Sequence, residues 1–319
     1  MSIKYILSNP QHRRGILYLF GACLIWAGWW VIIRQGIAGN GINPFDLAAI
    51  RYAVAGICLL PVLTHMGLGT SWMRAALLGL CGGLLNSLTA FYGIQYAPAS
   101  HGAALMPAMA PIFTALIAWL ALNESIGRMR WIGICVSIAG ALTIGSGYLA
   151  SADENQWIGH LMFLASSICW SLYIVLMRLW RINAWQGTAI AAVTAMIVYL
   201  PVYSFIVGGR VFDYPISTLL FHGFYQGILN SVAAFALFNF AIGIFGASAA
   251  AASSVMIPVF TVILAALFIG EIPTFIELIG ILAVIAGLPF AMGLIGQRDA
   301  AIHDDIADKS LGTRVDTRA

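Results

Sequence analysis

Two asparagines stand in long apolar runs, where polar side chains are uncommon. Asn86 lies in Gly-Leu-Leu-Asn-Ser and Asn230 in Gly-Ile-Leu-Asn-Ser, 144 residues further along the chain. An amide in hydrocarbon must find hydrogen-bond partners within the protein, because lipid offers none. Two interpretations are open for both residues: they join neighbouring helices by hydrogen bonds, or they line a polar cavity that binds a solute.

Aromatic side chains recur at matching places in the two halves. Trp26, Trp29 and Trp30 lie on one side of an apolar run, and Trp170 and Tyr173 follow Trp26 and Trp29 after 144 residues. Tryptophan usually marks the membrane interface, but Trp26 and Trp170 lie near the centres of their runs. The rings either pack the interior of a helix bundle or wall a cavity for flat or apolar solutes. Trp26, Trp30, Trp170 and Tyr173 are therefore candidates for substrate binding, with Asn86 and Asn230.

Arg51 and His101 are ionisable residues near the starts of apolar runs. Arg51 either extends its charge outward to the membrane surface or serves as a gate or a clamp for an anionic substrate. His101, beside Gly102, is either a hydrogen-bonded structural residue or a proton carrier, because histidine titrates near neutral pH. We include His101 among the candidate substrate-binding residues and Arg51 among the candidate gating residues.

Glutamates and prolines complete the candidates for gating or structural roles. Glu124 and Glu271 each follow an apolar run, where a carboxylate would cap the positive N-terminal end of the next helix or take part in gating. Pro111 and Pro258 remove backbone hydrogen bonds and bend helices. Bent helices suit a moving gate, although static membrane helices also contain proline.

The composition excludes a soluble protein. Of the 319 residues, 61% are hydrophobic and only 8% are charged, whereas soluble domains carry about 25% charged residues. Ten stretches are long and apolar enough to span a bilayer, which needs roughly 20 residues. They lie at 15–38, 46–66, 72–95, 99–122, 129–149, 157–180, 185–208, 216–241, 247–270 and 273–295. We therefore expect an all-α integral membrane protein with ten transmembrane helices.

Basic residues in the connections predict the orientation. They precede the first span and then recur in alternate connections, at Lys4, Arg13, Arg14, Arg74, Arg128, Arg130, Arg178 and Arg181. Such residues gather on the cytoplasmic side, so we expect a multi-pass protein of the inner (plasma) membrane with both termini in the cytoplasm. Arg34 and Arg178 end their spans and are expected to be topological anchors.

An internal repeat organises the chain. Besides the asparagines and tryptophans, Gly133 and Gly140 match Gly280 and Gly287 at an offset of 147 residues. Five spans per repeat is an odd number, so the second repeat must insert upside down relative to the first. The predicted domains are a first repeat at 15–149, a second repeat at 157–295 and a charged cytoplasmic tail at 296–319.

Inverted repeats favour a transporter. When two such halves exchange conformations, a site between them opens to either side of the membrane in turn. The polar and aromatic residues concentrate in spans 1, 3 and 4 and in spans 6, 8 and 9. We expect these six spans to surround one central cavity, with spans 5 and 10 at the periphery.

Enzyme chemistry has no support in the sequence. The spans hold no pair of carboxylates, the five cysteines form no CxxC pair, and there is no nucleotide-binding P-loop. No metal or other cofactor is expected, and ATP-driven pumping by this chain is not expected either. The net charge of +3 gives no indication of nucleic-acid binding.

The two halves contain short motifs that are typical of one family of proteins. They are Trp26 and Trp170, Pro44 with Arg51, the two Asn-Ser pairs, Ala-Pro-Ala-Ser-His-Gly-Ala-Ala at 97–104, Pro-Ile-Phe-Thr at 111–114, Leu-Asn-Glu at 122–124 and Gly-Glu at 270–271. With these motifs each half resembles an EamA-type module of the drug/metabolite transporter superfamily, over about residues 15–295. One departure is Ala191, which stands where the first half has Arg51. The resemblance implies transport and says little about the substrate.

We expect a secondary transporter that exports amino acids or related small metabolites by alternating access. Amide and tryptophan walls without a buried charge pair would hold small amphipathic or zwitterionic solutes loosely, and loose binding does not slow release. The alternative is a drug or other metabolite transporter for uptake or efflux. A nucleotide-sugar carrier is weaker, because phosphates call for several basic residues. The expected partners are a small-molecule substrate, the lipid bilayer and, in a coupled mechanism, protons; the chain would act as a monomer or a homodimer.

Overall fold

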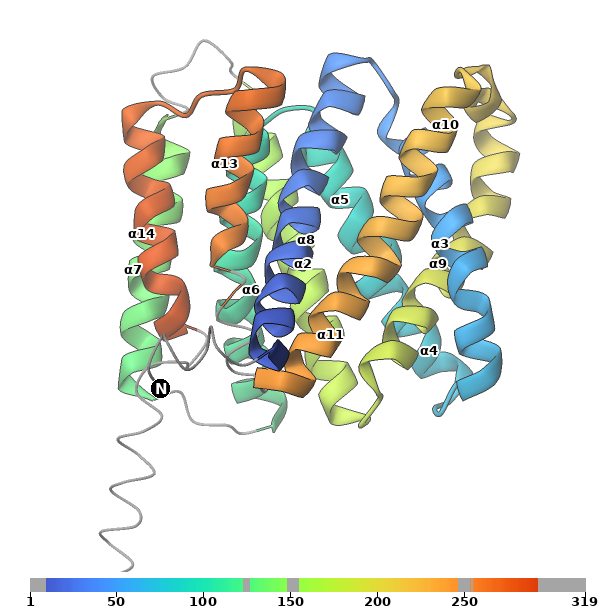
Figure 1. The fold of residues 1–319 in the computed structure, drawn as a ribbon, viewed down its shortest axis with the longest axis horizontal. Coiled ribbons are helices and arrows are strands. Elements are labelled where there is room, and N and C mark those ends of the chain that lie inside the picture. Colours follow the sequence, from blue (N-terminus) through green and yellow to red (C-terminus); the bar gives the residue numbers. More distant parts are fainter. Residues whose placement is uncertain (1–9, 123–126, 148–154, 246–252, 254, 292–319) are drawn as a thin grey trace, which may run out of the picture.

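The computed structural model describes residues 10–122, 127–147, 155–245, 253 and 255–291, which form a bundle of helices (Figure 1). The first half contains α2 (Pro10–Arg34) with η1 (Gln35–Gly39), α3 (Pro44–Met66), the continuous rod α4–η2–α5 (Trp72–Leu78, Gly79–Leu85, Asn86–Gly93), α6 (Ala99–Leu122) and α7 (Arg128–Gly147). The second half contains α8 (Gln156–Leu179), α9 (Ala184–Val207), η4 (Arg210–Asp213), the rod α10–η5–α11 (Ile216–His222, Gly223–Ala233, Ala234–Phe245), α13 (Met256–Ile269) and α14 (Phe275–Ala291).

These rods correspond to the ten predicted spans. Within the described residues, seven rods are long and apolar enough to cross a membrane, and α13 and α14 are shorter apolar helices. Large apolar side chains cover the outside of the bundle; Leu142 and Leu267 are 69% and 73% exposed, as contact with lipid requires. The expected all-α membrane fold is confirmed. The predicted tail at 296–319 and Glu124 lie outside the described residues.

The second span of each half begins in the same way. The side chain of Asn43 accepts a hydrogen bond from the backbone N–H of Phe45, and that of Asn183 accepts one from Trp185. Asparagine is a preferred N-cap, because its oxygen satisfies an N–H that has no partner within the helix. The Ile-Asn pairs that the two halves share in sequence are therefore the caps of α3 and α9.

The helix contacts of the first half have counterparts in the second half. In the first half α2 packs on α11 and α13, and in the second half α8 packs on α5 and α6, while α3 pairs with α9 and α7 with α14. Arg34 at the end of α2 and Gly159 near the start of α8 both contact the segment that joins α5 to α6. The corresponding helices α2 and α8 therefore run in opposite directions (Figure 1), as an inverted repeat demands.

Matched glycines bring α7 and α14 close together. A Cβ at Gly140 would lie 2.7 Å from the carbonyl oxygen of Gly280, and a Cβ at Gly280 would lie 2.8 Å from that of Gly140. Gly287 approaches Gly133 in the same way, with 2.9 Å from a built Cβ to the Gly133 oxygen. Small residues allow backbones to touch, and such contact holds membrane helices together. The matched glycines of the sequence therefore lie where the fifth and tenth spans, α7 and α14, touch each other.

Candidate functional site

A cavity of about 520 Å³ lies between the two halves. This volume is in the range of small-molecule sites, roughly 300–1,000 Å³. Eight of the sequence candidates line the cavity: Trp26, Trp30, Arg51, Asn86, Pro111, Trp170, Tyr173 and Asn230. His101, Pro258 and Glu271 are not among the lining residues.

The wall contains more helices than the sequence predicted. The expected spans contribute, but Arg51 and Tyr52 of α3 and Ala191 of α9 also line the cavity, and Arg130 of α7 reaches it. All six of the expected spans, 1, 3, 4, 6, 8 and 9, thus contribute to the wall, and the second span of each half, together with Arg130 of the fifth, completes it. The helices α3 and α9 pack against each other, and both present residues to the cavity.

The two asparagines line the cavity and also form hydrogen bonds between helices. Asn86 Nδ2 donates to the backbone oxygen and Oγ of Ser166, at 3.1 and 3.2 Å, and Ser166 Oγ donates back to the Asn86 carbonyl at 2.8 Å. With its amide oxygen turned toward Arg51, Asn230 accepts from Nη1 at 2.8 Å and Nη2 at 3.3 Å. Both asparagines therefore join helices and line the cavity, and their binding of a solute stays a prediction.

A stripe of serines on α8 was missed by the sequence reasoning. Ser167 and Ser171 donate to the backbone oxygens of Met106 and Ala110, both at 2.8 Å. These carbonyls immediately precede the prolines Pro107 and Pro111 of α6. The spacing of four residues on both helices could have shown that the two faces meet. The stripe holds α6 against α8 beside the cavity.

Arg51 does not extend to the membrane surface, so that interpretation is wrong. Its guanidinium carbon lies 5.4 Å from the ring centre of Trp29 and 6.0 Å from that of Phe91, within the range of cation–π attraction. Nη1 lies 3.4 Å from Oε1 of Gln226, which also accepts from Trp29 Nε1 at 2.6 Å. The arginine is half-buried, and it lines the cavity.

His101 belongs to a separate polar cluster. It is completely buried, its Nε2 lies 3.1 Å from Oε1 of Glu277, and its Nδ1 lies 3.0 Å from Nε2 of His160. The cluster joins α6, α14 and α8. His160 is thus a hydrogen-bond partner of His101, and Glu277 supplies a carboxylate near the start of its span.

Glu271 caps a helix, but not the next one along the chain. Its carboxylate accepts from the backbone N–H of Ala99 at 2.9 Å, at the start of α6, and pairs with Nε of Arg34 at 2.5 Å. Arg34 also donates to the carbonyl of Ile94 at 2.7 Å. The expected cap on α14 is therefore corrected to α6, and Arg34 joins three segments. Pro258, the third residue of α13, lies in the first turn, where a missing N–H removes no helical hydrogen bond.

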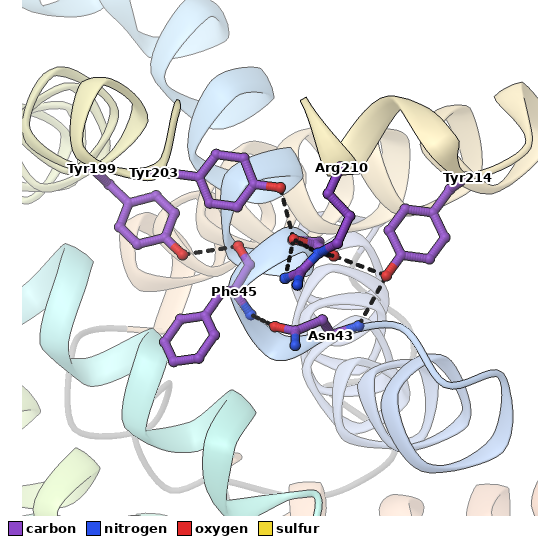
Figure 2. Close-up of polar contacts among 7 residues, drawn as sticks. Asn43, Phe45, Tyr199, Tyr203, Arg210 and Tyr214 are labelled. Carbon is purple, nitrogen blue, oxygen red and sulfur yellow. Dashed lines mark hydrogen bonds and ion pairs between the residues drawn. The ribbon is translucent and has the colours of Figure 1, made fainter. Parts of the chain in front are cut away.

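Asp46 is the centre of a further set of contacts at the same end of the bundle (Figure 2). Its carboxylate is fully buried and accepts from Tyr203 at 2.7 Å, from Tyr214 at 2.8 Å, and from Nε and Nη2 of Arg210, both at 2.9 Å. These bonds join the start of α3 to the end of α9 and to η4. Hydrogen bonding to Asp46 raises the pKa of Arg210, so the guanidinium stays charged at physiological pH.

One end of the bundle is therefore held by polar contacts, and we call it the tied end. It contains Arg34 with Glu271, Asp46 with Arg210, and His101 with Glu277. None of these residues lines the cavity. By contrast, Arg130 and Thr188, near the starts of α7 and α9 at the opposite end, do line it. The cavity thus extends toward the end where the described chain begins and finishes (Figure 1).

The residues described give no sign of a metal centre. No group of three or more histidine, cysteine, aspartate or glutamate side chains in this part of the chain is placed to hold an ion. The groups that the described cavity wall offers for binding are amides, aromatic rings and the guanidiniums of Arg51 and Arg130.

Comparison with known proteins decides the family. Residues 13–146 and residues 157–292 each match the EamA-like transporter family. The chain belongs to the EamA-like transporter family. It is a multi-pass membrane transporter of the drug/metabolite transporter superfamily with two EamA domains, and not an enzyme.

Relatives of this EamA-like transporter cover most of its length. The "Uncharacterized transporter YdfC" of Bacillus subtilis is 29% identical over 280 residues, covering 83% of this chain and 87% of the relative. A "Probable terminal-alkyne amino-acid exporter" of Streptantibioticus cattleyicolor is 26% identical over 285 residues, covering 82% and 88%. A solved crystal structure shares the fold, with a TM-score of 0.59 at 18% identity over 88% of this chain and 96% of the other.

Proposed function

We propose that this EamA-like transporter exports amino acids or related small metabolites by alternating access. The observation that carries the proposal is the cavity between the inverted halves, with its amides and aromatic rings. A solute there meets Asn86, Trp26 and Trp170 without having to break an ion pair of the described wall. The relative named as a probable amino-acid exporter supports the same substrate class.

The number of basic residues in the cavity wall distinguishes between the alternative substrates. A drug or another metabolite would use the same apolar surfaces, in uptake or in efflux. A nucleotide sugar carries phosphates and needs several basic groups, whereas Arg51 and Arg130 are the basic residues of the described lining. The wall therefore favours amino acids and similar solutes over nucleotide sugars.

The direction of opening follows from the tied end. Because polar contacts hold that end and the cavity extends to the other, exchange of conformations between the halves would release the tied end and expose the cavity there. We propose that the chain ends lie in the cytoplasm of a bacterial inner membrane, as the arginine distribution indicates. A reporter fused after Gln297 should then be active only if it is a cytosolic reporter, and activity of a periplasmic reporter would contradict this orientation.

Export is tested in cells that overproduce the protein. They should resist toxic amino-acid analogues and release preloaded labelled amino acids faster than control cells. Trp26→Ala removes an aromatic wall, and Asn86→Ala removes the hydrogen bonds to Ser166, so each should slow the release without lowering membrane abundance. Thr89→Ala is the matched control, because Thr89 does not line the cavity and donates to carbonyls of its own helix. Normal efflux in both test variants would contradict the role of the cavity.

Proton coupling, if the transporter uses it, is proposed to involve the cluster of His101, Glu277 and His160. Three titratable groups in contact can bind and pass one proton, and they join α6, α14 and α8. His101→Gln should therefore abolish the pH dependence of transport while leaving pH-independent flux. An unchanged pH profile in that variant would remove His101 from the mechanism.

A further inference from the structure

The guanidinium of Arg51 has neutral partners only. Within the described residues, its acceptors are the amide oxygens of Asn230 and Gln226, and the contact with Gln226 is long, at 3.4 Å. None of the ion pairs in this part of the structure includes Arg51. A guanidinium has five N–H donors in a planar fork, so several of them have no strong acceptor.

A second donor beside Arg51 also lacks a partner. Gln226 is fully buried, and its Nε2 has no hydrogen-bond partner in the described structure. The orientation of this amide is fixed, because Oε1 accepts from Trp29 Nε1 at 2.6 Å. A buried donor without an acceptor is unfavourable. Arg51 and Gln226 together thus form a group of donors, of which Arg51 lines the cavity and would meet an incoming acceptor.

The absence of acidic residues from the described cavity wall indicates that this acceptor is an anion. The described lining contains no aspartate or glutamate. The nearby acids are already occupied at the tied end, where Asp46 pairs with Arg210 and Glu271 with Arg34. Arg51 lines the cavity without a counter-ion among the described residues, so an anionic ligand would give it a charge-assisted partner. A carboxylate matches the fork of arginine with two parallel hydrogen bonds.

The repeat shows that there is one such group and not two. The positions corresponding to Arg51 and Gln226 in the opposite halves are Ala191 and Gly82. A side chain at Gly82 would collide with the ring of Tyr173. The wall around Gly82 and Ala191 therefore offers rings and small residues to the rest of the ligand, while Arg130 of the same lining donates to the carbonyl of Ala291.

We propose that this cavity selects solutes with one carboxylate and an apolar body, and that Arg51 binds the carboxylate. The inference rests on the proposed export function and names the feature of the substrate that the site recognises. A free ammonium group is not needed, because the described wall has no acid to receive it. N-acylated amino acids and other monocarboxylates therefore bind as well as free amino acids.

The test compares leucine, N-acetylleucine and leucinamide, which share one apolar body. Binding to the purified full chain is followed by tryptophan fluorescence, since Trp29 lies against Arg51. Leucine and N-acetylleucine should bind with similar affinity and leucinamide at least roughly tenfold more weakly, because a charge-assisted hydrogen bond is lost. Arg51→Gln should weaken the two carboxylates roughly tenfold to a hundredfold and leave leucinamide unchanged. Arg51→Lys, which keeps the charge, should restore part of the binding and shows that the position tolerates substitution.

The outcomes separate this inference from the export function. Release of labelled leucine and leucinamide from proteoliposomes at equal rates would support transport and overturn carboxylate selection. Selective, Arg51-dependent binding without release would support the inference and contradict export. Equal weakening of all three compounds in Arg51→Gln, or binding of none of them to the wild type, would overturn the inference.

Discussion

Replacing Asp46 by asparagine is expected to open the tied end. The substitution removes the charge that Arg210 faces and replaces one of the two oxygens that accept from Tyr203 and Tyr214 by an NH2 donor. Arg210 is 44% exposed, so water compensates part of the loss, and we expect a shift of about 1–3 kcal/mol toward the open state. A difference of about 1.4 kcal/mol changes a population roughly tenfold.

The opening is measured by labelling a cysteine in the cavity. Ala191→Cys in a cysteine-free background places a thiol in the wall, and a membrane-impermeant maleimide is added from the side of the tied end. Labelling should rise roughly tenfold when Asp46→Asn is added. Asp213→Asn is the matched control, because Asp213 is an exposed residue of the same turn, η4. Equal labelling with and without Asp46→Asn would show that this contact does not close the cavity.

Gly140→Leu is expected to separate α7 from α14. The first atom of a side chain there would lie 2.7 Å from the Gly280 oxygen and 2.8 Å from the Val284 nitrogen. Both are backbone atoms, so neither can move aside as a side chain could. Overpacking costs about 1–3 kcal/mol when a core can adjust, and more is expected where two backbones touch. The melting temperature and the membrane abundance should both fall.

Gly243→Leu is the control for this experiment. Gly243 lies on α11, another helix of the membrane bundle, and a Cβ there meets nothing within 4 Å. The Gly243→Leu substitution introduces the same side chain into an open position, so we expect a stability close to that of the wild type. A similar melting temperature for the Gly140 and Gly243 variants would contradict the close seam between α7 and α14.

The spans, the repeat and much of the cavity wall could be predicted from the sequence because lipid imposes a simple rule. A mid-span amide or a central tryptophan has few favourable places outside the interior of the bundle, and both halves repeat the pattern. Asn86, Asn230, Trp26 and Trp170 accordingly all line one cavity. The matched glycines likewise lie at a single helix contact.

The partners of individual side chains could not be predicted in the same way. Glu271 caps α6, 172 residues away, although α14 follows it directly. His101 was expected near the transport path, but it contacts Glu277 and His160 instead. Such pairs depend on which helices become neighbours and on their rotation. Periodicity and composition do not contain that information, because every span is apolar on most sides.

The most direct test of the account is release of a labelled amino acid from proteoliposomes that contain only this protein. If the cavity between the halves is a transport site, preloaded leucine should leave faster than from protein-free liposomes, and Trp26→Ala should slow its release at equal protein content. Release at the rate of protein-free liposomes across a panel of amino acids and related small metabolites would contradict the proposed export. Release that Trp26→Ala leaves unchanged would contradict transport through this cavity.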